Sequence, residues 1–181
     1  EWRGLGGNRG MNGVTSGVSV SSVTDSTIQL ANSANGYIIV TVSTTPGITF
    51  GGTVNGTKVL TASAAGGNVT FSGAVGATQA LGALTVNSTG TTTFSSTVSA
   101  ASVTTNTGGT TAINGGAITT SGAQTFNDAV TLGAATTLNT TNSNIAFAST
   151  LNSSSSSRAL TIGAGTGSVT FTGAVGGSLA L

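Results

Sequence analysis

The sequence contains no cysteine and no histidine, and only 4% of its 181 residues are charged. Without thiol and imidazole groups, the common zinc, haem and thiol- or imidazole-dependent catalytic sites cannot be built. Four basic residues against three acidic ones leave a net charge of +1, too little charge to follow a phosphate backbone. The composition therefore predicts a protein that is not an enzyme, holds no metal or cofactor, and does not bind nucleic acid.

Long apolar runs are also missing. The longest run of large apolar residues is Tyr37–Val40, far short of the ~20 residues that a membrane helix needs, so no transmembrane segment is predicted. A disordered linker would be poor in apolar residues, but 37% of this chain is hydrophobic and much of that is β-branched, which favours strands. The sequence begins at Glu1 and no signal peptide is visible, so we expect a processed or excised chain.

What the chain does contain is a repeat marked by phenylalanine. The six phenylalanines are spaced by 21, 23, 32, 21 and 24 residues. Each opens the same short motif: Phe, any residue, then Gly, Ser or Asp, then Ala or Thr, then Val or Leu. The 32-residue gap holds a degenerate copy at Ile113–Ile118, in which Ile replaces Phe. The motifs begin at Phe50, Phe71, Phe94, Phe126, Phe147 and Phe171.

A longer period lies above this one. Lys58–Leu81 aligns without a gap on Arg158–Leu181, an offset of 100 residues, with 13 identities in 24 positions. Leu181 corresponds to Leu81, after which the earlier copy continues. Repeats of about 20–25 residues inside a 100-residue unit predict a solenoid, and we expect it to continue beyond Leu181 in a parent protein.

The short segments alternate apolar residues with Thr, as in Val69-Thr70-Phe71, and clusters of Gly, Asn and Ser separate them. This pattern predicts short strands joined by turns. Three strands and three turns fill one coil, so the predicted fold is all-β: a right-handed parallel β-helix, or β-solenoid, with coils of about 20–25 residues. The predicted division is a divergent N-terminal segment at 1–46, either first coils or a cap, followed by solenoid repeats at 47–181.

Within such coils the six phenylalanines are predicted to point inward and stack. The residue before each Phe points outward, and it is Thr in five of six copies: Thr49, Thr70, Thr93, Thr125 and Thr170, with Ala146 as the exception. Stacked, these would form one exposed threonine column. Flat ice-binding solenoids resemble this arrangement but carry two columns, and the second column is absent here. Ice binding is therefore kept as an alternative to ordinary strand threonines.

The scattered charged residues predict no active site. Asp25 and Asp128 are interpreted as turn residues, because a catalytic acid would need a partner. Lys58 and Arg158 occupy equivalent positions in the 100-residue repeat and are interpreted as solvated turn residues. The run Ser153–Ser157 is predicted to be a loop that bulges from one coil. A β-helix that cleaves glycans would need several carboxylates on one face, which this chain lacks.

The repeats are similar to those of bacterial surface proteins. Val69–Gly76, Leu84–Asn87, Gly109–Gly116 and Ala123–Val130 resemble repeats of filamentous-haemagglutinin-type and autotransporter-type proteins, over residues 47–181. The resemblance implies an exported right-handed β-helix that serves as an adhesin or surface fibre. The secretion-domain motif and membrane barrel of such proteins are not visible in this sequence.

The function predicted from these features is a rigid extracellular stalk or fibre segment of a bacterial surface protein. Its expected partners are other copies of itself or adjoining repeats of the same parent protein, with a surface receptor that the sequence does not identify. The alternative is a filament subunit that joins end to end or by strand addition at exposed β edges.

Overall fold

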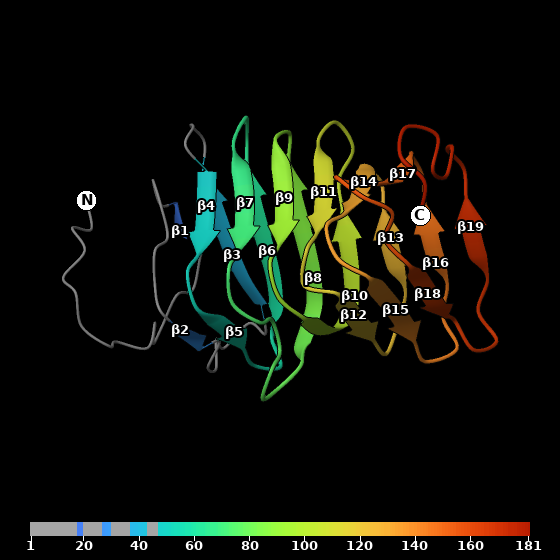
Figure 1. Cartoon of the computed structure of the whole chain (residues 1–181). Coiled ribbons are helices and arrows are strands. Elements are labelled where there is room, and N and C mark those ends of the chain that lie inside the picture. Colours follow the sequence, from blue (N-terminus) through green and yellow to red (C-terminus); the bar gives the residue numbers. More distant parts are fainter. Residues whose placement is uncertain (1–17, 20–26, 30–36, 43–46) are drawn as a thin grey trace.

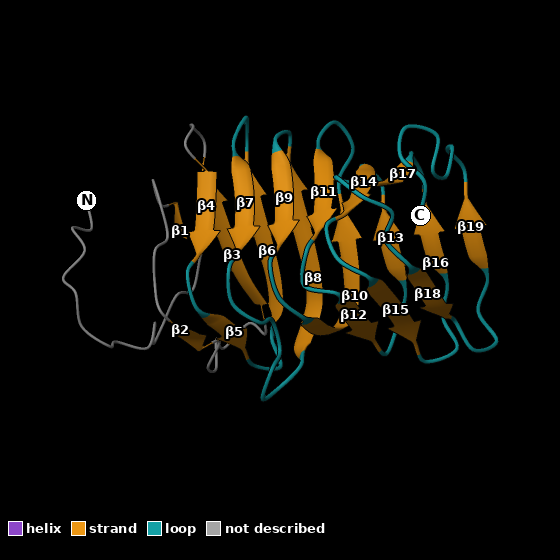
Figure 2. Ribbon diagram, in the orientation of Figure 1, coloured by secondary structure: helices purple, strands orange, loops and turns teal. Residues whose placement is uncertain are grey.

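The computed structural model describes residues 18–19, 27–29, 37–42 and 47–181, and in these ranges the chain is a stack of β-coils. Figure 1 shows the coils following one another from the N-terminal to the C-terminal end, and Figure 2 shows strands and loops only. The prediction of an all-β solenoid is confirmed. No helix in the described ranges could cross a membrane.

The larger sheet, here called wall A, has 11 strands. Its main path runs through β1 (Val18–Ser19), β3 (Tyr37–Val42), β6 (Val59–Ala64), β8 (Leu81–Ser88), β10 (Val98–Thr105), β12 (Ala117–Thr120), β15 (Thr136–Thr140) and β18 (Leu160–Gly163). A branch leaves this path at β10 and contains β13 (Gln124–Phe126), β16 (Ile145–Phe147) and β19 (Val169–Phe171). The single strand β10 is thus continued by two shorter strands in the next coil.

The second sheet, wall B, has six strands. They are β4 (Gly47–Phe50), β7 (Asn68–Phe71), β9 (Thr91–Phe94), β11 (Thr110–Ile113), β14 (Ala129–Leu132) and β17 (Leu151–Ser153). Figure 1 shows β4, β7, β9 and β11 side by side. A third pair joins β2 (Thr27–Gln29) to β5 (Thr53–Asn55).

All strand pairs in the described ranges are parallel, and each residue pairs with one that lies one coil further along the chain. Along wall B, Phe71 pairs with Phe94 and Phe94 pairs with Ile113. The degenerate copy at Ile113 therefore lies in register with the phenylalanines, as the sequence predicted. From residue 47 the chain forms six coils: 47–67, 68–90, 91–109, 110–128, 129–150 and 151–174. The boundary predicted between residues 46 and 47 stays a prediction.

The phenylalanines form two stacks, one on each wall. Phe50, Phe71 and Phe94 stack on wall B with ring centroids 4.7 and 5.3 Å apart. Phe126, Phe147 and Phe171 stack on the branch of wall A, at 5.2 and 5.1 Å. All except Phe171 are buried.

The wall that carries the Phe changes along the stack. On wall B the three phenylalanines are followed by Ile113, Leu132 and Ser153. On wall A the three later phenylalanines are preceded by Ala62, Val86 and Thr105. Each coil therefore has one Phe, on one wall, and a smaller residue at the matching position of the other wall. This arrangement keeps the side-chain volume per coil similar, as close packing of the core requires.

The Phe motif is a corner, and the chain uses it at two different places. After Phe71 the chain leaves wall B, and Val75 bridges to Val98 at the start of β10. After Phe171 the chain leaves wall A, and Val175 bridges to Leu151 on wall B. The backbone bonds are the same at both corners: the N–H after one Phe donates to the carbonyl of the Phe one coil earlier, 2.9 Å from Ser95 to Phe71 and from Thr172 to Phe147.

The middle residue of this corner lies directly against the previous coil. A Cβ added to Gly73 would lie 2.4–2.7 Å from backbone atoms of Gly52 and Thr53, and one added to Gly173 would lie 2.5–2.8 Å from Ser149 and Thr150. The two glycines have matching surroundings although they lie at different corners. At these two positions the backbone of the previous coil leaves no room for a side chain.

Asparagine side chains add a second set of bonds between coils. In five places an Asn Oδ1 accepts a hydrogen bond of 2.8–3.0 Å from a backbone N–H that lies 23 to 26 residues later. These bonds satisfy backbone groups at turns, where the strand ladder cannot reach them. The acceptors are Asn55, Asn68, Asn142, Asn144 and Asn152.

We expect Gly73→Ala to destabilise the protein by about 1–3 kcal/mol, because the added methyl group would overlap the backbone of the previous coil. Urea unfolding followed by circular dichroism measures this change. Ser72→Ala is the control, since Ser72 is exposed at the same corner and its change should be within about 0.5 kcal/mol. Equal stability of the two variants would contradict the close approach.

Phe71→Ala should cost about 3–5 kcal/mol, because Phe71 is buried between two stacked rings. Phe171→Ala should cost clearly less, because Phe171 is 42% exposed and stacks on one ring only. The same urea experiment compares the two variants. A larger loss from Phe171→Ala would mean that the described stacking does not determine the stability.

Candidate functional surface

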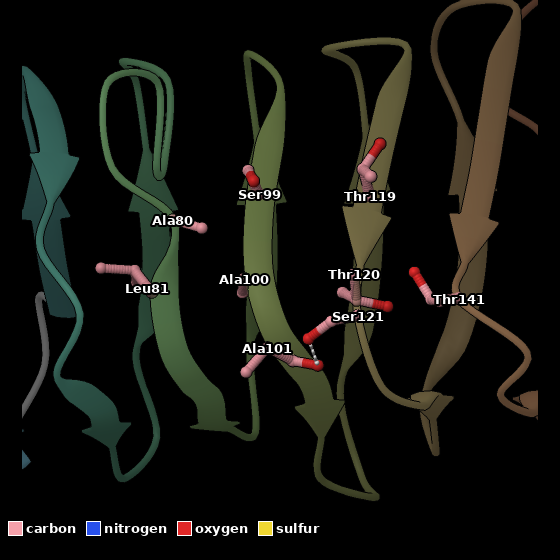
Figure 3. Close-up of a pocket in the computed structure, with 9 residues that line it drawn as sticks. All are labelled: Ala80, Leu81, Ser99, Ala100, Ala101, Thr119, Thr120, Ser121 and Thr141. Carbon is pink, nitrogen blue, oxygen red and sulfur yellow. Dashed lines mark hydrogen bonds between the residues drawn. The ribbon is translucent and has the colours of Figure 1, made fainter.

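A shallow groove of about 310 Å³ runs across four successive coils on wall A. Figure 3 shows its lining, which comes from the start of β8 and the residue before it, from β10, from β12 and the residue after it, and from the residue after β15. Leu81, Ala100 and Thr120 are buried at its floor. The groove contains no charged side chain. It therefore offers hydroxyl and small apolar groups, and no group that could act as a strong acid or base.

Some of the hydroxyl groups in this groove are engaged by the protein itself. The Thr120 hydroxyl bonds to the carbonyl of Gly122, and the Ser121 hydroxyl bonds at 3.4 Å to the carbonyl of Ala101, as drawn in Figure 3. Thr120 also lies 3.3 Å from Nε2 of the buried Gln124. These contacts hold together the point at which wall A divides.

The predicted threonine column is divided between the two walls. Thr49, Thr70 and Thr93 stack on wall B, where Ala112 follows Thr93. Thr125 and Thr170 lie on the branch of wall A, with Ala146 between them. The single five-member column is thus corrected to two shorter ones, because the Phe residues that follow these threonines change walls.

The sequence analysis missed the longest run of outward threonines. Thr61, Thr85, Thr104 and Thr125 pair in succession on wall A, without interruption over four coils. They escaped notice because the repeats were aligned on Phe, and Thr61, Thr85 and Thr104 precede small or β-branched residues. An alignment on the apolar residue before each Thr, such as Leu60 and Leu84, could have found them. All four are half-buried by their neighbours in the column.

Asp128 is the only carboxylate side chain in the described ranges, and it is 2% exposed. One oxygen accepts a hydrogen bond of 2.9 Å from the N–H of Gly109, and the other lies 3.4 Å from the hydroxyl of Thr111. Burial raises the pKa of Asp128 above its ordinary value of 3.8, although both hydrogen bonds oppose this change. Asp128 occupies the corner position predicted for it, but its side chain points to the previous coil.

The other polar candidates do not converge on a site. Lys58 and Arg158 each precede a strand of wall A, β6 and β18, on coils that are far apart in the stack. The residues Ser154–Ser157 form an exposed loop between β17 and β18. Asp25 lies outside the described residues. In the described part of the chain no group of three or more His, Cys, Asp or Glu side chains could hold a metal ion.

The last coil of this chain exposes apolar residues that earlier coils bury. Val169, Phe171 and Val175 are 40%, 42% and 46% exposed. Their counterparts in the 100-residue repeat, Val69 and Phe71 among them, are at most 1% exposed. The difference arises because each coil buries its inner residues only when another coil covers it.

The comparisons with known proteins give no relative. The chain matches no protein-family model, and neither the curated proteins nor the solved structures contain a significant match.

Proposed function

We propose that this chain is a rigid, non-enzymatic segment of an extracellular stalk or fibre on a bacterial surface, where it contributes to adhesion. The observation that supports this most is the continuous parallel pairing of wall B from β4 to β17, reinforced by two stacks of phenylalanines. Such pairing resists bending and stretching, because every coil is held by strand hydrogen bonds on more than one wall.

The dimensions favour a segment over a complete fibre. Six coils at a spacing of ~4.8 Å extend only about 29 Å. Useful reach therefore requires further coils, from adjoining repeats of the same parent protein. The resemblance of the repeats to those of bacterial surface proteins supports the same assignment. The uncharged, hydroxyl-rich groove and threonine columns are the surfaces through which adhesion would occur.

Antibodies against the chain should label intact cells of the bacterium that produces it as strongly as permeabilised cells. Beads coated with the chain should also adhere to a target surface more than beads coated with an unrelated β-rich protein. Labelling that requires permeabilisation would contradict the extracellular assignment. Surface labelling without adhesion would leave a stalk that carries no adhesive face and would contradict that part of the proposal.

A second candidate is self-association through the last coil, and the exposure of Val169, Phe171 and Val175 favours it. Strands β18 and β19 also have unpaired edges in this chain. An exposed edge with apolar residues beside it can accept a strand from another copy. In this reading the 181-residue chain joins end to end into filaments.

Sedimentation velocity of the purified chain at increasing concentration tests this candidate. We expect larger species as the concentration rises, and we expect Phe171→Asp to abolish them, because a charge at the covered position is costly to bury. Ser72→Asp introduces the same charge at an exposed corner of the second coil and should leave association unchanged. A monomer at all concentrations would exclude the filament.

A further inference from the structure

The buried polar side chains are concentrated in the middle of the solenoid. Ten polar or charged side chains are buried in the described ranges, and eight of them lie between Ser88 and Thr136. The eight are Ser88, Thr92, Thr105, Thr111, Thr120, Gln124, Asp128 and Thr136. The third coil has two of these side chains and the fourth has four, whereas every other coil has one, so the third and fourth coils have the most polar core.

This polar region coincides with the point where phenylalanine changes walls. Phe94 is the last Phe on wall B and Phe126 is the first on wall A, and the next inward residue over Phe94 is Ile113. In the neighbouring inward column of wall B, Val69 is followed by Thr92 and Thr111. The two aromatic stacks thus end in adjacent coils, on different walls, and no ring stacks across the interface between Phe94 and Phe126. We call these two coils, residues 91–128, the junction.

Several buried groups in the junction lack hydrogen-bond partners. Among the described residues, no group bonds to the hydroxyls of Thr92 and Thr105 or to Oε1 of Gln124. The amide nitrogen of Gln124, in contrast, contacts three oxygens, on Ile118, Thr120 and Asn139. A buried polar group without a partner favours the open state, in which water can bind it. Three of the four buried polar atoms without a partner in the described ranges thus lie in the junction, and the fourth, Nε of Arg158, lies in the last coil.

Asp128 lies in this junction and connects two of its coils through Gly109 and Thr111. The strands around it, β10, β11, β13, β14, β16 and β17, and the turn at 106–109 contain no other acidic or basic side chain. Within these strands and this turn no cation offsets its negative charge. Since folding raises the pKa of this carboxyl, the folded state prefers the protonated form. The protonated Asp128 carboxyl therefore makes its full contribution to the stability of the folded state at low pH. This contribution is lost as the pH rises through the pKa of the folded state.

We propose that the junction is the place where the solenoid opens first, separating two aromatic-stacked halves, and that the negative charge on Asp128 controls how readily it opens. The junction is then a conformational device within the stack: acid closes it, and neutral pH loosens it. This inference does not depend on where the protein resides or what it binds.

Hydrogen–deuterium exchange of the whole chain, expressed as protection relative to intrinsic rates, tests the first part. At about pH 7, amides of β9, β11 and β12 should be about tenfold or more less protected than those of β7 in the second coil and β15 in the fifth. Comparison with inner coils avoids the fraying of the ends. Equal protection of the three regions would overturn the proposal of a weak junction.

Thr92→Val and Thr105→Val remove the two unpartnered hydroxyls without changing side-chain shape, and together they should raise protection in the junction at every pH. Thr131→Val makes the same chemical change at an outward position of wall B, where Thr131 pairs with Ala112, and should not. If the double variant protected the junction no better than the control, the unpartnered hydroxyls would not be the cause of opening.

The role of the charge is tested by repeating the exchange at about pH 3. In the unmodified chain, protection of the junction should rise on acidification. Asp128→Asn should show the high protection at both pH values, and Asp128→Ser, which uses the residue present at the equivalent corner Ser149, provides a second neutral variant. Asp25→Asn removes the same charge elsewhere in the sequence and should keep the pH dependence. Persistence of the pH dependence in both Asp128 variants would overturn this part of the proposal.

Discussion

The parallel register between successive coils is the constraint on which the rest of the structure depends. A single coil has two or three strands and an inner side that only a neighbouring coil can cover, so no coil is stable alone. Register places equivalent residues ~4.8 Å apart along the stack. That spacing brings equivalent phenylalanine rings into contact, and they lie nearly parallel, at 6° to 20°. The abundance of small residues in the composition follows from this short distance between coils.

Register also determines how the core is filled. Where one wall of a coil has Phe, the matching position of the other wall has a smaller residue, as with Val86 in the coil of Phe71 and Leu132 in the coil of Phe147. Where Phe moves from wall B to wall A, the two adjacent coils at which the stacks end contain threonines at inward positions. The change of wall and the polar core of the junction are therefore two aspects of one packing problem.

The coil architecture could be predicted from the sequence because it depends on local patterns. The alternation of apolar residues with Thr predicted the strands, and clusters of Gly and Asn predicted the turns. The degenerate copy at Ile113 lies in register with Phe94, as expected. The wall on which each Phe lies could not be predicted in this way. The corner after Phe71 and the corner after Phe171 have nearly the same residues and the same backbone bonds. The wall from which each corner leads depends on how many strands of the same coil come before that corner. This number is a property of the whole stack.

The same limit applies to the candidate surfaces. Outward threonines at Thr61, Thr85 and Thr104 were missed because their column is defined by pairing across coils and not by a nearby Phe. Asp128 was expected in a turn, but only the structure places its carboxyl against the preceding coil. In a linear stack the stability of the whole is a sum over interfaces between neighbours, so the weakest interface governs opening. Parallel strand pairing and the two aromatic stacks hold the coils of this solenoid together, and the proposed junction at which the stacks end would limit the stiffness of the whole.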